Sequence, residues 1–267
     1  NRGGPQFHPG PSRLADTLIA MDTRVELIGE AFSLTCFRKK GSVMRKPRCG
    51  QKRKALKHKY LIAYSIWNKE DMIVPLMQAI EKHVPNEVLV EFMFDDPQDR
   101  SVDNFKAHAA KSGREWLHKV FDKEVQEIQT HRYAMAHGAE LGCRAVVCYQ
   151  DDMRLTGPII EPVEAMLDYY GEGIGIAGGR DGYDGGYNNM ISSSWSESAS
   201  ATRRLENGAH VPAQFLNPGP MIYPMITYAK VGPLPQGFKH FYVWDAYCGM
   251  CIDKSLQNAV IGTALEH

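Results

Sequence analysis

The chain contains 267 residues, of which 43% are hydrophobic and 10% aromatic, and its formal net charge at pH 7 is zero. This apolar content excludes a disordered chain and is enough for one large domain with an appendage. We expect no membrane span, because no apolar run reaches about 18 residues. The six cysteines are expected to be reduced thiols in a cytoplasmic protein, since no export signal is visible.

Residues 1–59 form a predicted N-terminal appendage whose charge differs from that of the rest of the chain. Apolar residues at helical spacing predict a helix over residues 12–32. Residues 38–59 then hold eleven of the 31 Lys and Arg residues and no Asp or Glu. Two interpretations of this basic segment stay open: a solvated linker that packs on the acidic remainder, or a patch for the phosphates of a nucleic acid or another polyanion.

From residue 60 onwards, short apolar runs alternate with segments of helical periodicity. The pattern predicts strands at residues 60–65, 88–94, 145–149 and 174–177, and helices at residues 69–83, 160–170 and 246–256. Residues 104–142 are charged and favour helix, whereas residues 178–210 have the composition of a functional loop. This order predicts an α/β fold with a mainly parallel central sheet flanked by helices.

Two pairs of acidic residues stand directly after predicted strands, Asp95-Asp96 after the second and Asp151-Asp152 after the third. The carboxyl ends of parallel strands share one edge of a sheet, where ligands bind. One such pair would be explained by solvated turn residues, but two pairs at equivalent strand ends weaken that interpretation. Carboxylates suit Mn²⁺ or Mg²⁺, which neutralise a diphosphate, and no glycine-rich phosphate loop follows the first strand.

Four segments in this order resemble the nucleotide-binding half of the inverting GT-A glycosyltransferases, the large family 2 of nucleotide-diphospho-sugar transferases. They are similar to the family's opening strand and turn, its apolar strand ending in two Asp, its Arg-containing helix and its Asp-x-Asp metal motif. In this chain they are residues 62–71, 90–96, 132–142 and 146–152. The resemblance implies a Rossmann-like GT-A fold and a nucleotide-sugar donor.

The same resemblance divides the chain after its basic appendage. It implies a GT-A catalytic domain over residues 60–264, with a nucleotide-binding half at 60–152 and an acceptor-binding half at 153–264. Residues 265–267 look like a tag remnant and are set aside. Nothing in the sequence indicates an oligomeric state.

The resemblance also assigns nucleotide-binding residues. Ser65 is expected near the base, with Asn68 in the same turn. Asp95 is expected to accept a hydrogen bond from the base ring, for which uracil is the expected case. Arg132 would reach the nucleoside or the diphosphate. His131 and His137, which flank this arginine, are interpreted as ordinary polar residues of a helix.

The metal site and the catalytic base follow from the same comparison. Asp152 is expected to be the main ligand of Mn²⁺ or Mg²⁺, with Asp151 facing the ribose or the water shell of the metal. Gln150 stands where the first acid of the motif is usual. Asp245 falls on the position of the catalytic base, although an Asp also suits a helix N-cap, and Trp244 replaces the acid that normally precedes the base.

The expected reaction is hexosyl-type transfer from a nucleotide-diphospho-sugar, with UDP the expected nucleotide, to a hydroxyl of a carbohydrate acceptor with inversion. Three alternatives remain. The acceptor could be a hydroxymethylated base in DNA, bound through residues 38–59. The chain could be a nucleotidyltransferase, which would release pyrophosphate. It could also be a binding module whose catalytic site has decayed, for which Gln150 and Trp244 are the support.

Overall fold

The computed structural model describes residues 25–31, 34–39, 59–179, 189–190, 204–237 and 242–266. The chain divides into two compact units, residues 1–50 and residues 51–267. In the first unit β1 (Val25–Ala31) pairs antiparallel with β2 (Leu34–Lys39). The helix predicted over residues 12–32 is therefore wrong for residues 25–31, where Gly29, a poor helix former, lies at an irregularity of the hairpin. Residues 12–24 lie outside the described part of the chain.

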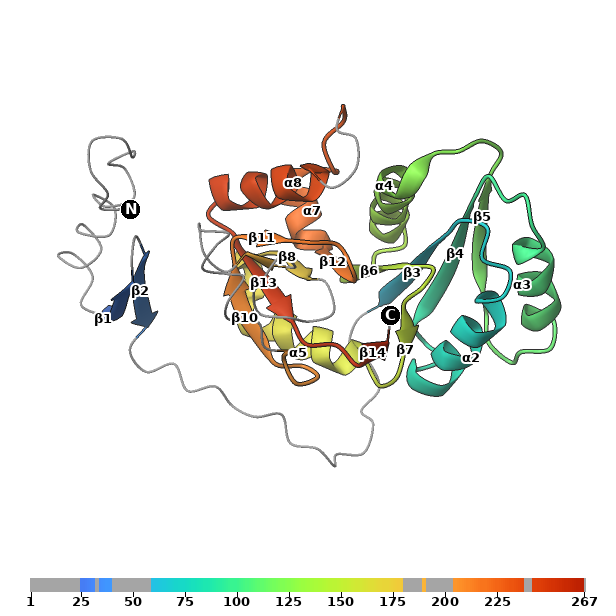
Figure 1. The fold of residues 1–267 in the computed structure, drawn as a ribbon, viewed down its shortest axis with the longest axis horizontal. Helices are drawn as coiled ribbons and strands as arrows, with labels where there is room; N and C mark the ends of the chain where they lie inside the picture. Colours follow the sequence, from blue (N-terminus) through green and yellow to red (C-terminus); the bar gives the residue numbers. More distant parts are fainter. Residues whose placement is uncertain are drawn as a thin grey trace. The chain divides into compact units, whose positions relative to one another are not determined.

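The second unit is built on an eight-stranded sheet with the order β10-β13-β8-β12-β6-β3-β4-β5 (Figure 1). Its strands are β3 (Tyr60–Ile66), β4 (Leu89–Asp95), β5 (Leu117–Phe121), β6 (Ala145–Gln150), β8 (Ile174–Gly178), β10 (His210–Ala213), β12 (Met221–Pro224) and β13 (Gln257–Ile261). β12 runs antiparallel to both of its neighbours and β10 runs antiparallel to β13, while the remaining pairs are parallel. The predicted mainly parallel α/β sheet is confirmed.

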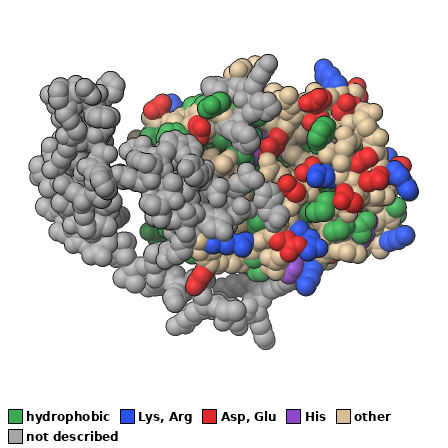
Figure 2. Space-filling view, viewed as in Figure 1, with side chains coloured by type: hydrophobic (Ala, Val, Ile, Leu, Met, Phe, Trp, Pro, Cys, Tyr) green, Lys and Arg blue, Asp and Glu red, His purple; other side chains and the backbone are tan. Residues whose placement is uncertain are grey.

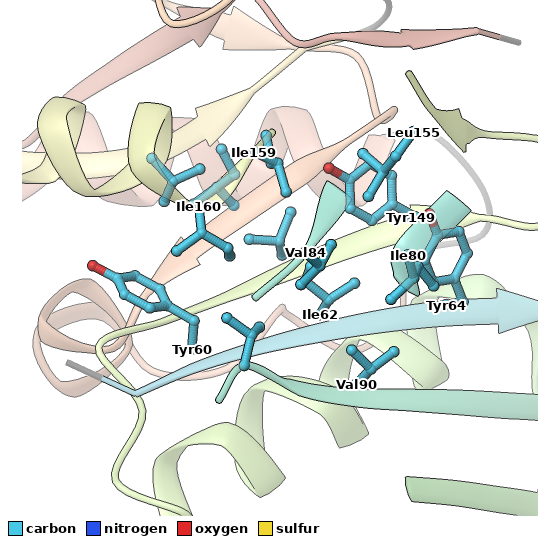
Figure 3. Packing of buried hydrophobic residues seen from close by; sticks show 14 of the residues in the cluster. Tyr60, Ile62, Tyr64, Ile80, Val84, Val90, Tyr149, Leu155, Ile159 and Ile160 are labelled. Atoms are coloured by element: carbon cyan, nitrogen blue, oxygen red, sulfur yellow. The ribbon is translucent and has the colours of Figure 1, made fainter. Parts of the chain in front are cut away.

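Helices cover both faces of this sheet. They are α2 (Ile73–His83), α3 (Ser101–Ala109), α4 (Gln126–Glu140), α5 (Ile160–Tyr170), the short 3₁₀ helix η1 (Gly171–Gly173), α7 (Met225–Val231) and α8 (Tyr242–Asp253). Alternate side chains of a strand point to opposite faces. Tyr60, Ile62 and Tyr64 of β3 accordingly pack with α2, α3 and α5 (Figure 3), whereas Leu61 and Ala63 pack with α4 and α8.

Two small two-stranded sheets complete the described fold. β9 (Asn189–Met190) pairs with β11 (Phe215–Leu216), and β7 (Arg154–Leu155) pairs with β14 (Leu265–Glu266). The side chain of Leu265 is buried. Residues 265–266, which the sequence analysis set aside as a tag remnant, are therefore part of the fold.

Four strands of the eight-stranded sheet were not predicted from the sequence, namely β5, β10, β12 and β13, and the final helix begins at Tyr242 instead of residue 246. β5 lies within the segment predicted to favour helix. It is an edge strand whose residues are only partly buried or exposed, so its sequence lacks the apolar run of a central strand. Within the described residues, no helix is both long and apolar enough to cross a membrane.

Arg114 stabilises the turn between α2 and β4 through three buried hydrogen bonds. Its Nη1 donates to the carbonyl oxygen of Val84 at 3.0 Å, and its Nη2 donates to those of Pro85 and Val88 at 2.9 and 2.5 Å. Arg114→Ala would remove all three of these hydrogen bonds, although the Pro85 carbonyl would keep the backbone N–H of Val88 at 3.1 Å, so we expect a loss of about 2–4 kcal/mol in the free energy of unfolding.

Urea denaturation followed by circular dichroism would measure this loss. The matched control is Arg154→Ala, because Arg154 forms an exposed ion pair with Glu266 and should change stability by less than about 0.5 kcal/mol. Equal losses in the two variants would contradict the role given to Arg114.

Candidate donor-binding and catalytic site

The carboxyl ends of three parallel strands, β3, β4 and β6, are in register. Ser65 of β3 lies opposite Met93 of β4 on one side and opposite Gln150 of β6 on the other. The segments that follow these strands therefore meet at one edge of the sheet. Among the residues predicted to form the site, Ser65, Asn68, Asp95, Asp151 and Asp152 all lie at this edge.

Asp151 connects the turn after β6 to the turn after β3. Its Oδ2 accepts a hydrogen bond from the backbone N–H of Trp67 at 3.0 Å. Burial raises the pKa of Asp151 to about 6, against the lowering effect of the Trp67 amide, and the negative charge of Asp152 adds to the rise. Two carboxylates are thus held side by side at the strand end, where a cation would relieve their repulsion.

The donor set after β6 fits a divalent cation that shares its coordination with a phosphate ligand. Among the described residues, no three His, Cys, Asp or Glu side chains converge to hold an ion by themselves. Mg²⁺ in phosphate-binding sites is usually held by one or two carboxylates, with phosphate oxygens and water as its other ligands. Asp152 and Asp151 supply oxygen donors of that kind and number.

Asp95 has a structural role that the sequence analysis did not foresee. Its Oδ1 accepts the backbone N–H of Val125 at 2.7 Å and its Oδ2 accepts that of Gln126 at 2.8 Å, and the residue is buried. These amides belong to the start of α4, where a carboxylate is favoured by the unpaired N–H groups and the helix dipole. Asp95 therefore anchors α4 to the sheet, and its contact with a base stays a prediction.

Asn68 holds the turn after β3 against the loop after β4. Its Oδ1 accepts the backbone N–H of Gln98 at 2.7 Å. The Nε2 of Gln98 in turn donates to Oδ1 of Asp96 at 3.0 Å. Asn68 and Asp96 both have positive φ angles, 50° and 41°, which Asn and Asp tolerate better than most residues. The observed contacts of Asn68 are with protein, so nucleotide binding by this residue stays a prediction.

Ser65 of β3 contacts α4, the helix that carries Arg132. The Oγ of Ser65 lies 2.6 Å from Oγ1 of Thr130, which donates to the carbonyl oxygen of Glu127 at 2.7 Å. Arg132 is half-buried, and its Nη1 is buried without a hydrogen-bond partner among the described residues. A buried guanidinium donor without a partner is costly, and an anionic ligand such as a diphosphate would satisfy it.

Asp245 lies in the first turn of α8 and is half-buried, and burial raises the pKa of its carboxyl above the ordinary range. α8 precedes β13, which runs parallel to β8. The antiparallel strand β12 and the helix α7 come between β8 and α8 in the chain. The position of Asp245 relative to Asp151 and Asp152 stays a prediction.

Several residues at this edge were missed or misjudged from the sequence. Trp67, at the turn after β3, has 60% of its surface exposed. Its position next to Asn68 is the one sequence feature that could have indicated it as a site residue. Glu127 is bound by Gln150. His131 and His137 are not ordinary polar helix residues, because His131 is buried and Nδ1 of His137 lies 2.8 Å from Oε2 of the buried Glu91.

The described cysteines take no part in the site. Cys143, Cys148, Cys248 and Cys251 are buried and free. Burial raises the pKa of the Cys143 thiol to about 11, and it raises the pKa of Cys148 and Cys248 as well. Thiols in this state are poor nucleophiles and poor metal ligands. The reduced state of the six cysteines stays a prediction.

No family model matches the sequence, and no curated protein matches it. Solved structures do resemble the chain. The mannosyltransferase PcManGT from Pyrobaculum calidifontis, in complex with GDP-Man and Mn²⁺, superposes with a TM-score of 0.55 at 9% identity over 83% of this chain and 61% of that one. GalNAc-T7 with UDP, GalNAc and Mn²⁺ gives 0.54 at 9% identity over 76% and 42%. S. aureus TarS gives 0.53 at 12% identity over 76% and 35%.

The fold is the GT-A fold. The resemblance predicted from the four segments is thereby confirmed at the level of the fold. The chain spans about three fifths or less of the length of these solved proteins. In the GT-A fold of this chain, the acids predicted as donor ligands lie at one edge of the sheet, and the role of Asp245 stays a prediction.

Proposed function

We propose that the chain is a glycosyltransferase that moves a sugar from a nucleotide-diphospho-sugar to an acceptor hydroxyl. The observation that carries this proposal is the hydrogen bond from the Trp67 amide to Asp151 within the GT-A fold. It fixes the carboxylate of Asp151 beside the turn after β3, and Asp152 follows Asp151 directly in the chain. The three solved neighbours are glycosyltransferases by name, and two of them were solved with a nucleotide or nucleotide sugar and Mn²⁺.

The proposed donor site combines acidic and basic groups. Asp152, with Asp151 beside it, would hold Mn²⁺ or Mg²⁺, which when bound neutralises charge on the diphosphate. Arg132 would donate its unpaired Nη1–H to the diphosphate or the nucleoside. UDP is the proposed nucleotide, and Ser65, Asn68 and Asp95 are proposed to surround its base.

The proposed chemistry is a single displacement with inversion at the anomeric carbon. The carboxylate of Asp245 takes the proton of the acceptor hydroxyl while the hydroxyl oxygen forms a bond to that carbon. The bond between the anomeric carbon and the diphosphate oxygen breaks, and the nucleoside diphosphate leaves with the electron pair. Burial of Asp245 favours this step, because a carboxyl whose pKa is raised is a stronger base.

Product analysis tests the proposal against its closest rival. Incubation with UDP-sugars, Mn²⁺ and a panel of oligosaccharides should release UDP and yield a glycoside of inverted configuration. A nucleotidyltransferase would release pyrophosphate instead. Background hydrolysis alone across the donor panel would support a decayed binding module.

The alternative of a DNA acceptor rests on the sequence of residues 38–59. Beyond the backbone of residues 38–39 and Lys59, this segment lies outside the described residues. On the face of the molecule drawn in Figure 2, acidic and basic side chains of the described residues are interspersed. We propose a carbohydrate acceptor, and a test for transfer to hydroxymethylated DNA belongs in the same acceptor panel.

Arg132 provides a prediction on donor affinity. Arg132→Met keeps a long side chain but removes the charged hydrogen-bond donor. We therefore expect the Kd for UDP to rise about 10- to 100-fold, the equivalent of about 1.5–3 kcal/mol. Isothermal titration calorimetry in the presence of Mn²⁺ would measure it. Arg154→Ala, on the surface pair with Glu266, is the control and should leave the Kd unchanged, and an unchanged Kd in Arg132→Met would exclude Arg132 from the donor site.

A further inference from the structure

A single path of side chains connects the end of β6 with the first turn of α8. Nε2 of Gln150 donates to both carboxylate oxygens of Glu127 at 3.1 Å. Oε1 of Glu127 lies 3.4 Å from Nε2 of His131, within ion-pair range although not aligned as a hydrogen bond. Nδ1 of His131 lies 2.9 Å from the hydroxyl of Tyr223, which accepts the indole N–H of Trp244 at 2.9 Å. We call these five residues the polar chain.

The chemistry of the donors gives the polar chain a direction. The indole of Trp244 can only donate, so the oxygen of Tyr223 accepts from it. The hydroxyl hydrogen of Tyr223 is then available to Nδ1 of His131. In the tautomer that accepts this hydrogen at Nδ1, neutral His131 carries its own hydrogen on Nε2, which faces Glu127. Hydrogen-bond donors on three elements, α8, β12 and β6, are thus connected to the carboxylate of Glu127 on α4.

The polar chain is largely withdrawn from water. His131, Tyr223 and Trp244 each have 1% of their surface exposed, whereas the Glu127 side chain is 26% exposed. The ring of His131 also contacts the rings of Tyr223 and Trp244 edge to face. In a buried site, water does not readily substitute for a lost hydrogen-bond partner. Each hydrogen bond of the polar chain therefore restricts the relative positions of the two elements that it joins.

Both ends of the polar chain adjoin residues of the proposed site. Gln150 directly precedes Asp151 and Asp152, and Trp244 directly precedes Asp245. Gln150 and Trp244 are also the two positions at which the sequence departs from the pattern of the family it resembles. The two departures are therefore linked, because each residue supplies an N–H donor to the same buried path.

We propose that the polar chain is a positioning device that holds Asp245 in a fixed relation to the carboxylates after β6. Glu127, His131, Tyr223 and Trp244 are positioning residues in this assignment, which rests on the proposed function in taking Asp245 as the base. A small displacement of a catalytic group lowers the rate of the chemical step far more than it lowers the affinity for the donor. Loss of a link should thus reduce kcat and leave donor binding intact.

Tyr223→Phe tests the proposal, because it removes one hydroxyl and two links. We expect kcat to fall about 10- to 100-fold and the Kd for UDP with Mn²⁺ to stay unchanged. The matched control is Tyr247→Phe. Tyr247 is also buried, lies on α8 itself, and donates its hydroxyl to the carbonyl oxygen of Gly232 at 2.7 Å, outside the polar chain. The Tyr247→Phe variant should be less stable than the wild-type protein but keep its kcat. Equal kcat values in Tyr223→Phe and Tyr247→Phe would overturn the proposal.

Glu127→Gln provides a second variant at the partly exposed end, where folding is less at risk. It should also lower kcat without changing the Kd for UDP. If the polar chain acts as a unit, the Glu127→Gln/Tyr223→Phe double variant should lose no more than the worse single variant. Losses that multiply would show separate roles and overturn the proposal. Wild-type protein that transfers no sugar would instead overturn the proposed function, and the role of the polar chain with it.

Discussion

Asp152→Asn is expected to lower kcat/KM for the nucleotide-sugar on the order of 10³-fold, which corresponds to about 4 kcal/mol of transition-state stabilisation. The substitution keeps the size of the side chain and removes the charge that would hold the cation. Asp152 stands beside Asp151, whose Oδ2 is held by the Trp67 amide, so Asp151 has one oxygen outside that bond and does not replace the charge that Asp152→Asn removes. Initial rates at several Mn²⁺ concentrations would measure the effect.

Two controls keep this result specific. Asp122→Asn removes an exposed carboxylate after β5 and should leave the rates unchanged. Circular dichroism should show that Asp152→Asn folds as the wild-type protein does. Wild-type rates in Asp152→Asn would mean that the divalent cation, if one is used, is bound elsewhere.

Asp245→Asn is expected to lower kcat about 10²- to 10⁴-fold, the usual contribution of a general base, with little change in the Kd for UDP. The amide keeps the position in the first turn of α8 but cannot accept the acceptor's proton. Asp253→Asn is the matched control, because Asp253 is an exposed acid at the other end of the same helix. Unchanged kcat in Asp245→Asn would leave Asp245 as a helix residue and remove the argument for inversion.

The pH dependence of kcat provides an independent check on Asp245. Burial raises the pKa of its carboxyl, and the base acts in its deprotonated form. The activity of the wild-type protein should therefore decrease as the pH falls through a pKa above the ordinary value for Asp, and Asp245→Asn should lack this ionisation. The same raised pKa means that folding favours the protonated form, so Asp245 costs stability as the pH rises through its folded-state pKa.

The parts of the fold that could be predicted are those set by local patterns. β3, β4, β6 and β8 are short apolar runs buried on both faces, and α5 was predicted with the bounds that the structure has. β5 and β10 lie at the two edges of the sheet, where a strand needs no continuous apolar run. The strand β1 was missed because four apolar residues at helical spacing outweighed Gly29 in the sequence pattern.

The positions of the candidate site residues were predicted better than their contacts. Parallel strands bring Asp95 and Asp151 to one edge, and this follows from the alternation of strands and helices alone. The binding of Asp95 to the start of α4 was not foreseen, because it depends on where that helix begins. His131 and Tyr223 are 92 residues apart, and no local pattern announces a contact at such separation. The sequence pattern of α4 therefore did not distinguish its buried polar residues from solvent-exposed ones.

Calorimetric titration of UDP tests the central claim most directly, namely that the carboxylates after β6 bind the donor's diphosphate through a divalent cation. The account predicts that wild-type protein binds UDP with Mn²⁺ present, binds it far more weakly in EDTA, and that Asp152→Asn shows the weak binding under both conditions. Equal affinity of the wild-type protein for UDP with Mn²⁺ and with EDTA would contradict it.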